Sequence, residues 1–308
     1  MNETTKELLK VVSEIDGTDF GNVAFNIRED GQCAGRQSSK YVKIENKPDG
    51  PGLVINISSE AQGEMVYIPA CVTHGDVDDL VYNDFYVGDG ADVIIVAGCG
   101  VHTTDGHDAR HNGIHRFFLG KGSHVLYKEK HIGTGSGKGL KKIDPVTDVY
   151  LDEDSVLEMD TIQLGGVDST IRKTTGKLKA RAKLIIHERI MTDGDETAQT
   201  DFEVSLDGED SGVDIVSRSV AKGNSYQEYH STIKGNCRCT GHSECDAILA
   251  DNGRVNAAPE LYAGDLDASL IHEAAIGKIA GEQLIKLQTL GLTEQEAEQK
   301  IIDGFLRG

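Results

Sequence analysis

Phe85-Tyr-Val-Gly-Asp-Gly-Ala-Asp-Val93 is the stretch that decides the fold, because it returns 32 residues later as Phe117-Phe-Leu-Gly-Lys-Gly-Ser-His-Val125. After another 32 residues it returns in looser form as Val149-Tyr-Leu-Asp-Glu-Asp-Ser-Val-Leu157, and a degenerate copy follows at Val204–Val213. Each copy places branched or aromatic residues on both sides of a Gly- or Asp-rich turn, which indicates two short strands joined by that turn. A fixed period of about 20–50 residues is typical of stacked repeat architectures.

Stacking follows from the repeat because a single coil cannot bury its own apolar face. Strand patterns continue from Leu53 to Tyr262, in short runs broken by Gly and Asp. The chain holds 36 glycines, no tryptophan and only 5% aromatic residues, which indicates many turns and disfavours a helical globule. A propeller is the alternative, but the copies are few and carry no blade signature. We therefore predict a mainly β fold of the β-helix or β-solenoid type.

The predicted solenoid occupies residues 53–268 and has two different flanks. Residues 1–52 combine a short helix over residues 3–15 with an irregular, Gly-rich segment. Residues 269–308 are predicted to be a C-terminal helical segment. The apolar face of the N-terminal helix is formed by Leu8, Leu9, Val12 and Ile15.

A helical hairpin is predicted near the C-terminus from local signals. Gly291 would end the first helix in a left-handed conformation. Thr293-Glu-Gln-Glu296 is a capping box for the second helix. Two interpretations stay open, a cap over the last coil and a docking surface for a partner subunit. The apolar residues at helical spacings are Leu284, Leu287, Ile301, Ile302 and Phe305.

Composition restricts the class of partner. The 308-residue chain has a formal net charge of −20, whereas a nucleic-acid partner requires a Lys/Arg footprint. The same charge disfavours anionic membrane surfaces, and no apolar run approaches the ~20 residues of a spanning helix. The first ten residues have no apolar signal core. We expect a cytoplasmic protein that binds neither nucleic acid nor membrane, and whose six cysteines stay reduced.

Cys237, Cys239 and Cys245 form the strongest local metal signal, because thiolates are preferred ligands of iron–sulfur clusters and of Zn²⁺. Their spacing matches neither a ferredoxin run nor a zinc ribbon. In a continuous strand the three side chains would share one face. The spacing favours an open, incomplete site over a closed structural one. The alternative is three buried core thiols.

A second cluster suggests different chemistry. Cys99 and His102 are followed by His107, His111 and His115, with Gly and acidic residues between them. Imidazoles in such a loop could bind Zn²⁺ or Fe²⁺, although the spacings fit no mononuclear motif. A metal-dependent hydrolase or isomerase built on these residues is therefore the alternative function. It would bind metal in the isolated protein.

The C-terminal region carries a family resemblance. Ser269-Leu-Ile-His-Glu-Ala-Ala-Ile-Gly-Lys-Ile279 is followed by Glu282-Gln-Leu, Gly291-Leu-Thr-Glu-Gln-Glu-Ala297 and Ile302-Asp-Gly-Phe305. Together these runs resemble the C-terminal signature of the SufB/SufD proteins, scaffold components of the SUF iron–sulfur cluster assembly machinery. The match is dense over roughly 60 residues, and His272-Glu273 resembles the SufB form.

The resemblance implies a right-handed parallel β-helix with helical ends and a non-catalytic scaffold that carries a transient iron–sulfur cluster. It implies that residues 269–308 dock a SufC-type ABC ATPase, through Leu284, Leu287, Ile301 and Phe305. It also implies that His272 or Glu273 assists as a cluster ligand or proton carrier. We further expect a homodimer joined through strands near Cys237–Leu261, because an open solenoid end exposes a strand edge.

Two features depart from simple expectations. Many SufB proteins have a functional cysteine just before their Pro-X-Leu motif, but residues 251–258 contain none. Either the Cys237, Cys239 and Cys245 thiols supply that role or the chain is a SufD-like partner. The Gly-rich run Gly133–Gly139 is not a Walker A loop, because Ile132 replaces its first glycine and Gly139 its Ser/Thr. ATPase activity is therefore expected in the partner.

Overall fold

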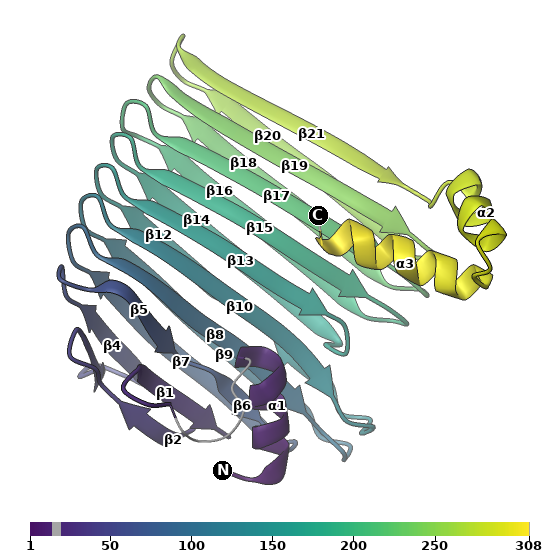
Figure 1. The fold of residues 1–308 in the computed structure, drawn as a ribbon, viewed down its shortest axis with the longest axis horizontal. Coiled ribbons are helices and arrows are strands. Elements are labelled where there is room, and N and C mark those ends of the chain that lie inside the picture. The colour runs from purple at the N-terminus through teal and green to yellow at the C-terminus, as the bar shows by residue number, and fades with distance from the viewer. Residues whose placement is uncertain (14–19, 308) are drawn as a thin grey trace.

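The computed structural model describes residues 1–13 and 20–307. Its main body is a β-solenoid of about eight turns, with one helix near the N-terminus and two at the C-terminus. In Figure 1 the strands of the near sheet run from left to right while the chain climbs from bottom to top, so the coil is right-handed. The predicted mainly β, right-handed solenoid is confirmed.

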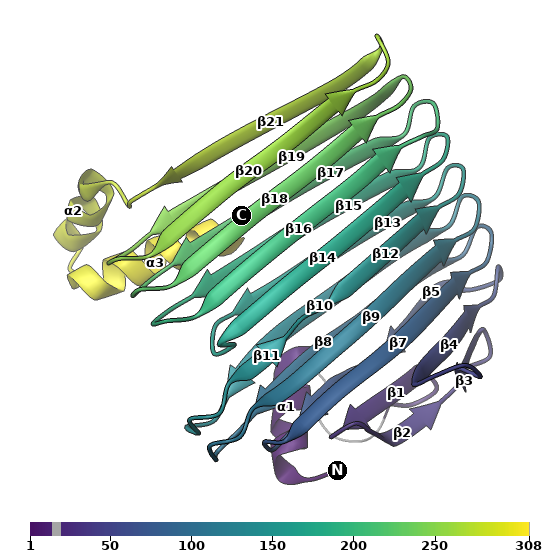
Figure 2. The same ribbon diagram turned by 180° about the vertical axis from the view of Figure 1, so that it is seen from behind.

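Two long sheets form the walls of the solenoid, and within each sheet neighbouring strands come from successive coils. The first sheet, which faces the viewer in Figure 1, contains β2 Gln32–Gln37, β1 Ala24–Glu29, β5 Gln62–Tyr67, β6 Ala70–Val72, β8 Asp92–His102, β10 His124–Thr134, β13 Val156–Leu164, β15 Lys183–Thr192, β17 Gly212–Ala221, β19 Cys239–Leu249 and β21 Ala268–Gly277. The second sheet, which faces the viewer in Figure 2, contains β20 Arg254–Ala263, β18 Tyr226–Gly235, β16 Thr197–Leu206, β14 Ser169–Leu178, β12 Val146–Leu151, β11 Lys141–Ile143, β9 Ala109–Leu119, β7 Val77–Val87, β4 Gly52–Ile57 and β3 Val42–Asn46.

The sequence repeat corresponds to strand register. Val87 is aligned with Leu119, and Leu119 with Leu151, so the spacing of 32 residues is one complete coil. Leu178 and Leu206 continue the same row with shorter coils. All five side chains point inward and are buried, because alternate residues of a strand share one face.

The turn within each repeat explains its Gly- and Asp-rich centre. Gly90 and Gly122 occupy equivalent turns with φ of 69° and 63°. Asp154 takes the same left-handed conformation with φ of 61°. Glycine adopts this region without a Cβ penalty, and Asp tolerates it better than most residues. The third copy can therefore replace Gly by Asp and keep the turn.

The N-terminal coils carry a helix on the outer face of the first sheet. Helix α1, Glu3–Ser13, packs its buried Leu8, Leu9 and Val12 against the first sheet, as predicted, whereas Ile15 lies outside the described residues. A Cβ on Gly98 would lie 2.4 Å from the Val12 carbonyl oxygen, so this glycine permits the close approach. The expectation of an irregular segment up to residue 52 is wrong for residues 20–52, because β1 pairs antiparallel with β2, and β3 with β4.

The C-terminal end is open. The expected helical segment 269–308 begins later than predicted, because residues 269–277 belong to β21, which pairs in parallel with β19. Strands β20 and β21 end the two sheets, and most of their residues are exposed. Helix α2, Gly281–Thr289, has no buried residue, whereas α3, Glu294–Arg307, packs on the first sheet (Figure 1). Within the described residues, no helix is both long and apolar enough to cross a membrane.

The hairpin signals act as predicted. The Thr293 and Glu296 side chains form the reciprocal capping box, with 2.8 Å from the Thr293 nitrogen to Glu296 Oε2 and 3.3 Å from the Glu296 nitrogen to Thr293 Oγ1. Gly291 has φ of 96° after α2. Because these interactions involve residues close in sequence, they could be predicted without knowledge of the packing.

Candidate functional site

Cys237 and Cys239 lie where the chain enters β19, at the open end of the solenoid. The Cys239 thiol is buried over Gly235 of β18, whereas Cys237 is half-exposed. Their thiols interact, and the Cys237 thiol lies 3.4 Å from the Leu206 carbonyl oxygen. The structure therefore brings two of the three predicted thiols together.

Cys245 shares the inward face of β19 with Cys239 but lies six residues further along the strand. At the rise of a β-strand this separation is about 20 Å. Both thiols belong to the apolar core between the sheets. The three cysteines of one chain therefore do not converge on one metal ion.

Burial disfavours the thiolate form of these three cysteines. It raises the pKa of Cys245 to about 12, and it also raises the pKa of Cys237 and Cys239. Thiolates are the metal-binding and nucleophilic form of cysteine. Cluster binding by these residues therefore requires either exposure of the thiols or their deprotonation by the arriving metal.

His272 and Glu273 are neighbours in sequence but lie on opposite faces of β21. His272 is half-buried, faces the interior and is aligned with Ser243 of β19. Its buried Nδ1 has no hydrogen-bond partner among the described residues. Glu273 is exposed on the outer face. Alternation along a strand separates the predicted pair, so the two side chains cannot act on the same atom from one chain.

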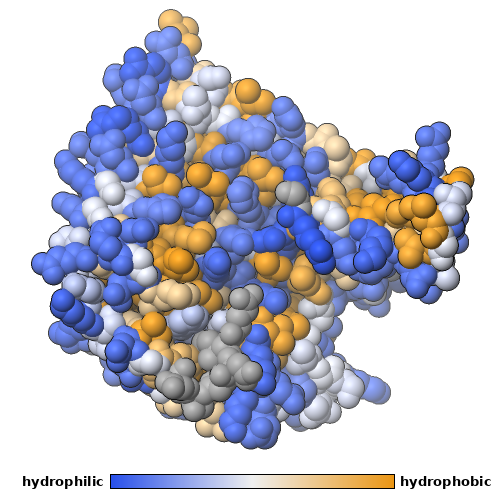
Figure 3. Space-filling view, viewed as in Figure 1, coloured by the Kyte–Doolittle hydropathy of each residue, from blue (hydrophilic) through white to orange (hydrophobic). Residues whose placement is uncertain are grey.

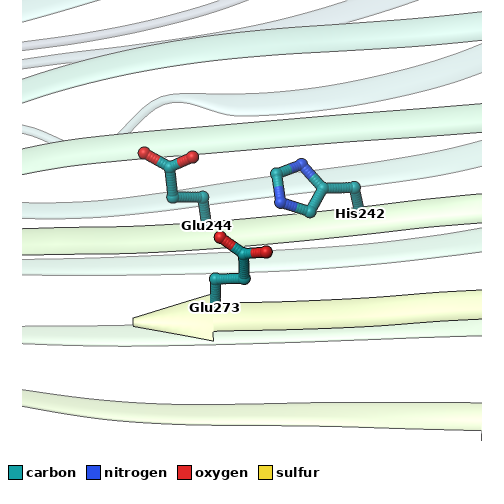
Figure 4. Close-up of side chains that lie close together, drawn as sticks. All are labelled: His242, Glu244 and Glu273. Carbon is teal, nitrogen blue, oxygen red and sulfur yellow. The ribbon is translucent and has the colours of Figure 1, made fainter. Parts of the chain in front are cut away.

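On the outer face Glu273 meets two residues to which the sequence analysis assigned no role. His242 and Glu244 of β19 and Glu273 of β21 each offer a ligand atom, and these atoms all lie within 4.8 Å of one another (Figure 4). His-X-Glu on one strand was a usable signal, because residues two apart share a face. The alignment of β19 with β21, which brings Glu273 next to Glu244, could not be predicted from the sequence.

The alternative histidine cluster does not form one site. Cys99 is buried in a small apolar cluster, and burial raises its pKa well above the usual value. His102 pairs with Thr134 at 2.9 Å, while His107 lies in an exposed loop 3.1 Å from Asp76. Within residues 1–13 and 20–307, none of these side chains belongs to a converging group of three metal-ligating residues.

His111 and His115 belong to the polar interior of the middle coils. His111 Nδ1 lies 3.0 Å from Asp79 Oδ2, and His115 Nδ1 lies 2.8 Å from the Tyr127 hydroxyl. Burial lowers the pKa of His115 to about 4, so this imidazole is neutral at pH 7. Hydrogen bonds within the protein therefore account for both histidines.

The sequence analysis missed the ion pair at the centre of this interior. Arg172 Nη1 donates to Glu129 Oε2 at 2.6 Å, and Arg172 Nε lies 3.4 Å from Glu188 Oε1. Burial alone would raise the pKa of Glu129, but His131 and Arg172 outweigh it and hold that pKa well below its usual range. The residues come from β10, β14 and β15, so only the stacked coils bring them together.

The predicted docking residues divide into two groups. Ile301 and Phe305 of α3 pack against a cluster containing Val220 and Ile248 of the solenoid, together with Ile302 and Leu306 of α3 itself. Helix α2 has no buried side chain, and its Leu284 and Leu287 remain half-exposed. The two interpretations of the hairpin therefore apply to different helices, because α3 covers the solenoid and α2 leaves an apolar face free.

The space-filling view shows this free face directly. Hydrophobic side chains lie over α2 among hydrophilic ones (Figure 3). Ile285 is 60% exposed and Leu290 is 75% exposed at the end of the helix. Exposed apolar patches of this kind mark interaction surfaces more often than scattered single residues do.

Comparison with known proteins supports the sequence resemblance. Residues 82–305 match the family described as "SUF system FeS cluster assembly, SufBD core domain". An iron–sulfur cluster assembly SufBD family protein of Methanothermobacter thermautotrophicus is 28% identical over 248 residues, covering 79% of this chain and 59% of the relative. A relative with the same description from Archaeoglobus fulgidus is 27% identical over 273 residues, covering 88% and 72%.

The family match covers the solenoid from within β7 onward and the C-terminal hairpin as far as Phe305. It includes the thiols at the open end, the His242, Glu244 and Glu273 group, and both C-terminal helices. The chain spans 59% of the length of the Methanothermobacter relative. The predicted family is confirmed: this chain belongs to the SufBD family of iron–sulfur cluster assembly proteins.

Proposed function

We propose that this chain is a scaffold on which an iron–sulfur cluster is built and then transferred, with the open end of the solenoid as the assembly region. Family membership over residues 82–305 carries the proposal. The placement of Cys237, Cys239 and His272 in the last coils supports it, because soft and borderline ligands gather where the core is uncovered. The cluster is cargo here and not a resident cofactor.

One chain offers an incomplete ligand set, and a second copy would complete it. The exposed edges of β20 and β21 can pair with another chain, since unpaired strand edges invite such contacts. In a two-fold homodimer each thiol group would meet its symmetry mate across the interface. The cluster would then take ligands from both chains, and opening of the interface would release it.

The partner that opens the interface is proposed to be a SufC-type ABC ATPase bound at α2. ATP-driven movement of two ATPase subunits would pull on the hairpins and expose Cys239 and Cys245. Their raised pKa values support a gated mechanism, because exposure of a buried thiol would favour the thiolate form that binds metal. The proposed setting for this complex is the cytoplasm.

Anaerobic reconstitution tests the scaffold role. The wild-type chain should take up iron and sulfide and give the absorption and Mössbauer signature of a cluster. The variant with Cys237, Cys239 and Cys245 all changed to Ser should lose most of that signal. Cys33→Ser, at an exposed thiol on β2, is the matched control and should keep it. Full cluster occupancy in the triple variant would overturn the assignment.

Co-purification tests the docking surface. Leu284→Asp combined with Leu287→Asp should abolish binding of the ATPase, because these residues are three apart and both changes place charge on the same apolar face of α2. Val11→Asp, an exposed apolar residue on α1 at the other end of the molecule, should leave binding unchanged. Phe305 is a poorer probe, because its contacts with the solenoid make any effect partly structural. Retention of the ATPase by the double variant would contradict the proposal.

A further inference from the structure

Three outward-facing side chains at the open end form a compact group of oxygen and nitrogen ligands. His242 and Glu244 lie two residues apart on β19, and Glu273 of β21 is directly aligned with Glu244. One ligand atom from each lies within 4.8 Å of the other two. Figure 4 shows the imidazole and both carboxylates on the same side of the sheet, without an intervening strand.

The imidazole of His242 is already oriented for a ligand. Its Nδ1 lies 2.8 Å from Asp214 Oδ1 on the neighbouring strand β17. Metal-binding histidines commonly pair one ring nitrogen with a carboxylate in this way, which fixes the ring and leaves the other nitrogen for the metal. Nε2 of His242 is therefore the atom available to the group.

The charge pattern on this sheet face provides an independent argument. Further down the same face, His124 lies between Asp92 and Glu158, with its two ring nitrogens 3.0 and 3.1 Å from their oxygens. Glu244 and Glu273, in contrast, place like charges directly opposite each other. Neither carboxylate has a hydrogen bond or ion pair within the described part of the chain.

An aligned pair of like charges on adjacent strands destabilises a sheet unless a counter-charge compensates it. A divalent cation between the two carboxylates would turn that repulsion into attraction, because a bound ion is the largest local charge in such a site. Glu244 also lines a cleft of about 450 Å³ that extends to Leu306 and Arg307 of α3. An incoming ion can therefore reach Glu244 through this cleft, and Glu273 is itself exposed.

We propose that His242, Glu244 and Glu273 bind one divalent transition-metal ion through His242 Nε2 and a carboxylate oxygen of each glutamate, with water in the remaining positions. One imidazole and two carboxylates suit Fe²⁺, Mn²⁺ or Zn²⁺, and the absence of sulfur separates this site from the thiols. The choice of Fe²⁺ as the physiological ion rests on the proposed scaffold function. Cys245 lies next to Glu244 in sequence and faces the interior, so the site holds iron on the outer face of the strand that carries an assembly thiol.

Mn²⁺ binding followed by electron paramagnetic resonance tests this site, because Mn²⁺ prefers oxygen and nitrogen over thiolate ligands. The wild-type chain should bind one equivalent. Glu244→Gln and Glu273→Gln should each weaken that binding at least tenfold. Asp214→Asn, which removes only the partner of His242, should weaken it on the order of 10–100-fold. All three substitutions are on the outer face, so the fold should tolerate them.

His124→Ala is the matched control. This histidine lies on the same face of the same sheet beside two carboxylates, but both ring nitrogens already have partners. Its loss should leave Mn²⁺ affinity unchanged. Binding that is equal in wild type, Glu244→Gln and Glu273→Gln would overturn the proposal, and so would a wild-type chain that binds no Mn²⁺.

The outcome can be separated from that of the scaffold proposal. The triple Ser variant of Cys237, Cys239 and Cys245 should still bind one Mn²⁺ although it assembles no cluster. A chain that reconstitutes a cluster but does not bind Mn²⁺ would refute the metal site alone. A chain that binds Mn²⁺ at these residues but never assembles a cluster would refute the scaffold function alone.

Discussion

The middle coils and the last two coils of this solenoid differ in whether their polar side chains are buried and paired. In the middle coils Glu129 and Arg172 are almost completely buried and form an ion pair. In the last two coils Glu244 and Glu273 are directly aligned at the surface without a cationic partner in the described residues. The two pairs occupy different faces of their strands: Glu129 and Arg172 point into the core between the sheets, whereas Glu244 and Glu273 lie on the outer face. A further coil also stacks on each middle coil, whereas no strand among the described residues stacks beyond β20 and β21.

This contrast indicates that different coils of one fold serve different roles, stability in the middle and binding at the end. Paired, buried polar groups specify how successive coils stack, and they are expensive to disturb. Unpartnered groups at an uncovered end are available to ions, cargo or another chain. Substitutions in the middle coils should therefore change stability, and substitutions in the last coil should change binding.

The largest effect is expected at the buried ion pair. Arg172→Leu should lower the free energy of unfolding by about 3–5 kcal/mol, because it leaves Glu129 and Glu188 buried without their cation. Denaturant unfolding measures the change. Arg181→Leu is the control, since Arg181 pairs with Asp154 in an exposed position and such pairs contribute about 1 kcal/mol or less. An equal decrease in the free energy of unfolding in both variants would show that the buried ion pair contributes no more than the exposed one.

The next effect concerns pH and the same interior. The folded-state pKa of His115 is about 4, below its ordinary value of 6.5, so the unfolded chain binds a proton between these values and the folded chain does not. Stability should therefore fall by roughly 3 kcal/mol as pH decreases from about 6.5 to 4.

His115→Gln tests the origin of this acid sensitivity. Glutamine can hydrogen-bond to Tyr127 but does not titrate, so the variant should show a shallower loss of stability over this pH range. A residual slope should remain from His131, whose pKa burial also lowers. Thermal unfolding at several pH values measures both slopes, and identical slopes in wild type and variant would contradict the assignment to His115.

The smallest effect is expected at the open end, and it should appear in association and not in folding. Tyr262→Lys together with Ile271→Lys places charge on the exposed last coil, where these side chains are 57% and 51% exposed. The homodimer should dissociate about 10–100-fold more readily, while the midpoint of unfolding of the monomer stays the same.

Analytical ultracentrifugation measures that shift. Leu80→Lys, at an exposed apolar position on β7, is the control and should leave the association unchanged. A wild-type chain that remains monomeric at micromolar concentration would show that the open end is not a self-association surface.

Features that depend on residues close in sequence could be predicted from the sequence. The turn chemistry around Gly90 and the alternation on both sides of it identify a strand–turn–strand unit, and the 32-residue period stacks these units. The capping box of Thr293 and Glu296 is equally local. The turn and the capping box each lie within about ten residues, and the 32-residue period can be counted along the sequence, so no knowledge of the packing is needed to interpret them.

Tertiary structure decided which side chains meet. Coils shorten after Leu151, so the register that aligns Glu244 with Glu273 could not be counted from the 32-residue period. Because successive side chains of a strand point to opposite faces, His272 and Glu273 lie on opposite faces of β21. The same coil packing dispersed the histidines between residues 102 and 115 and paired Glu129 with Arg172, 43 residues away. In a solenoid the neighbours of a side chain come from the next coil, and the length of each turn sets that distance. Sequence therefore determined the repeated unit, and stacking determined the site.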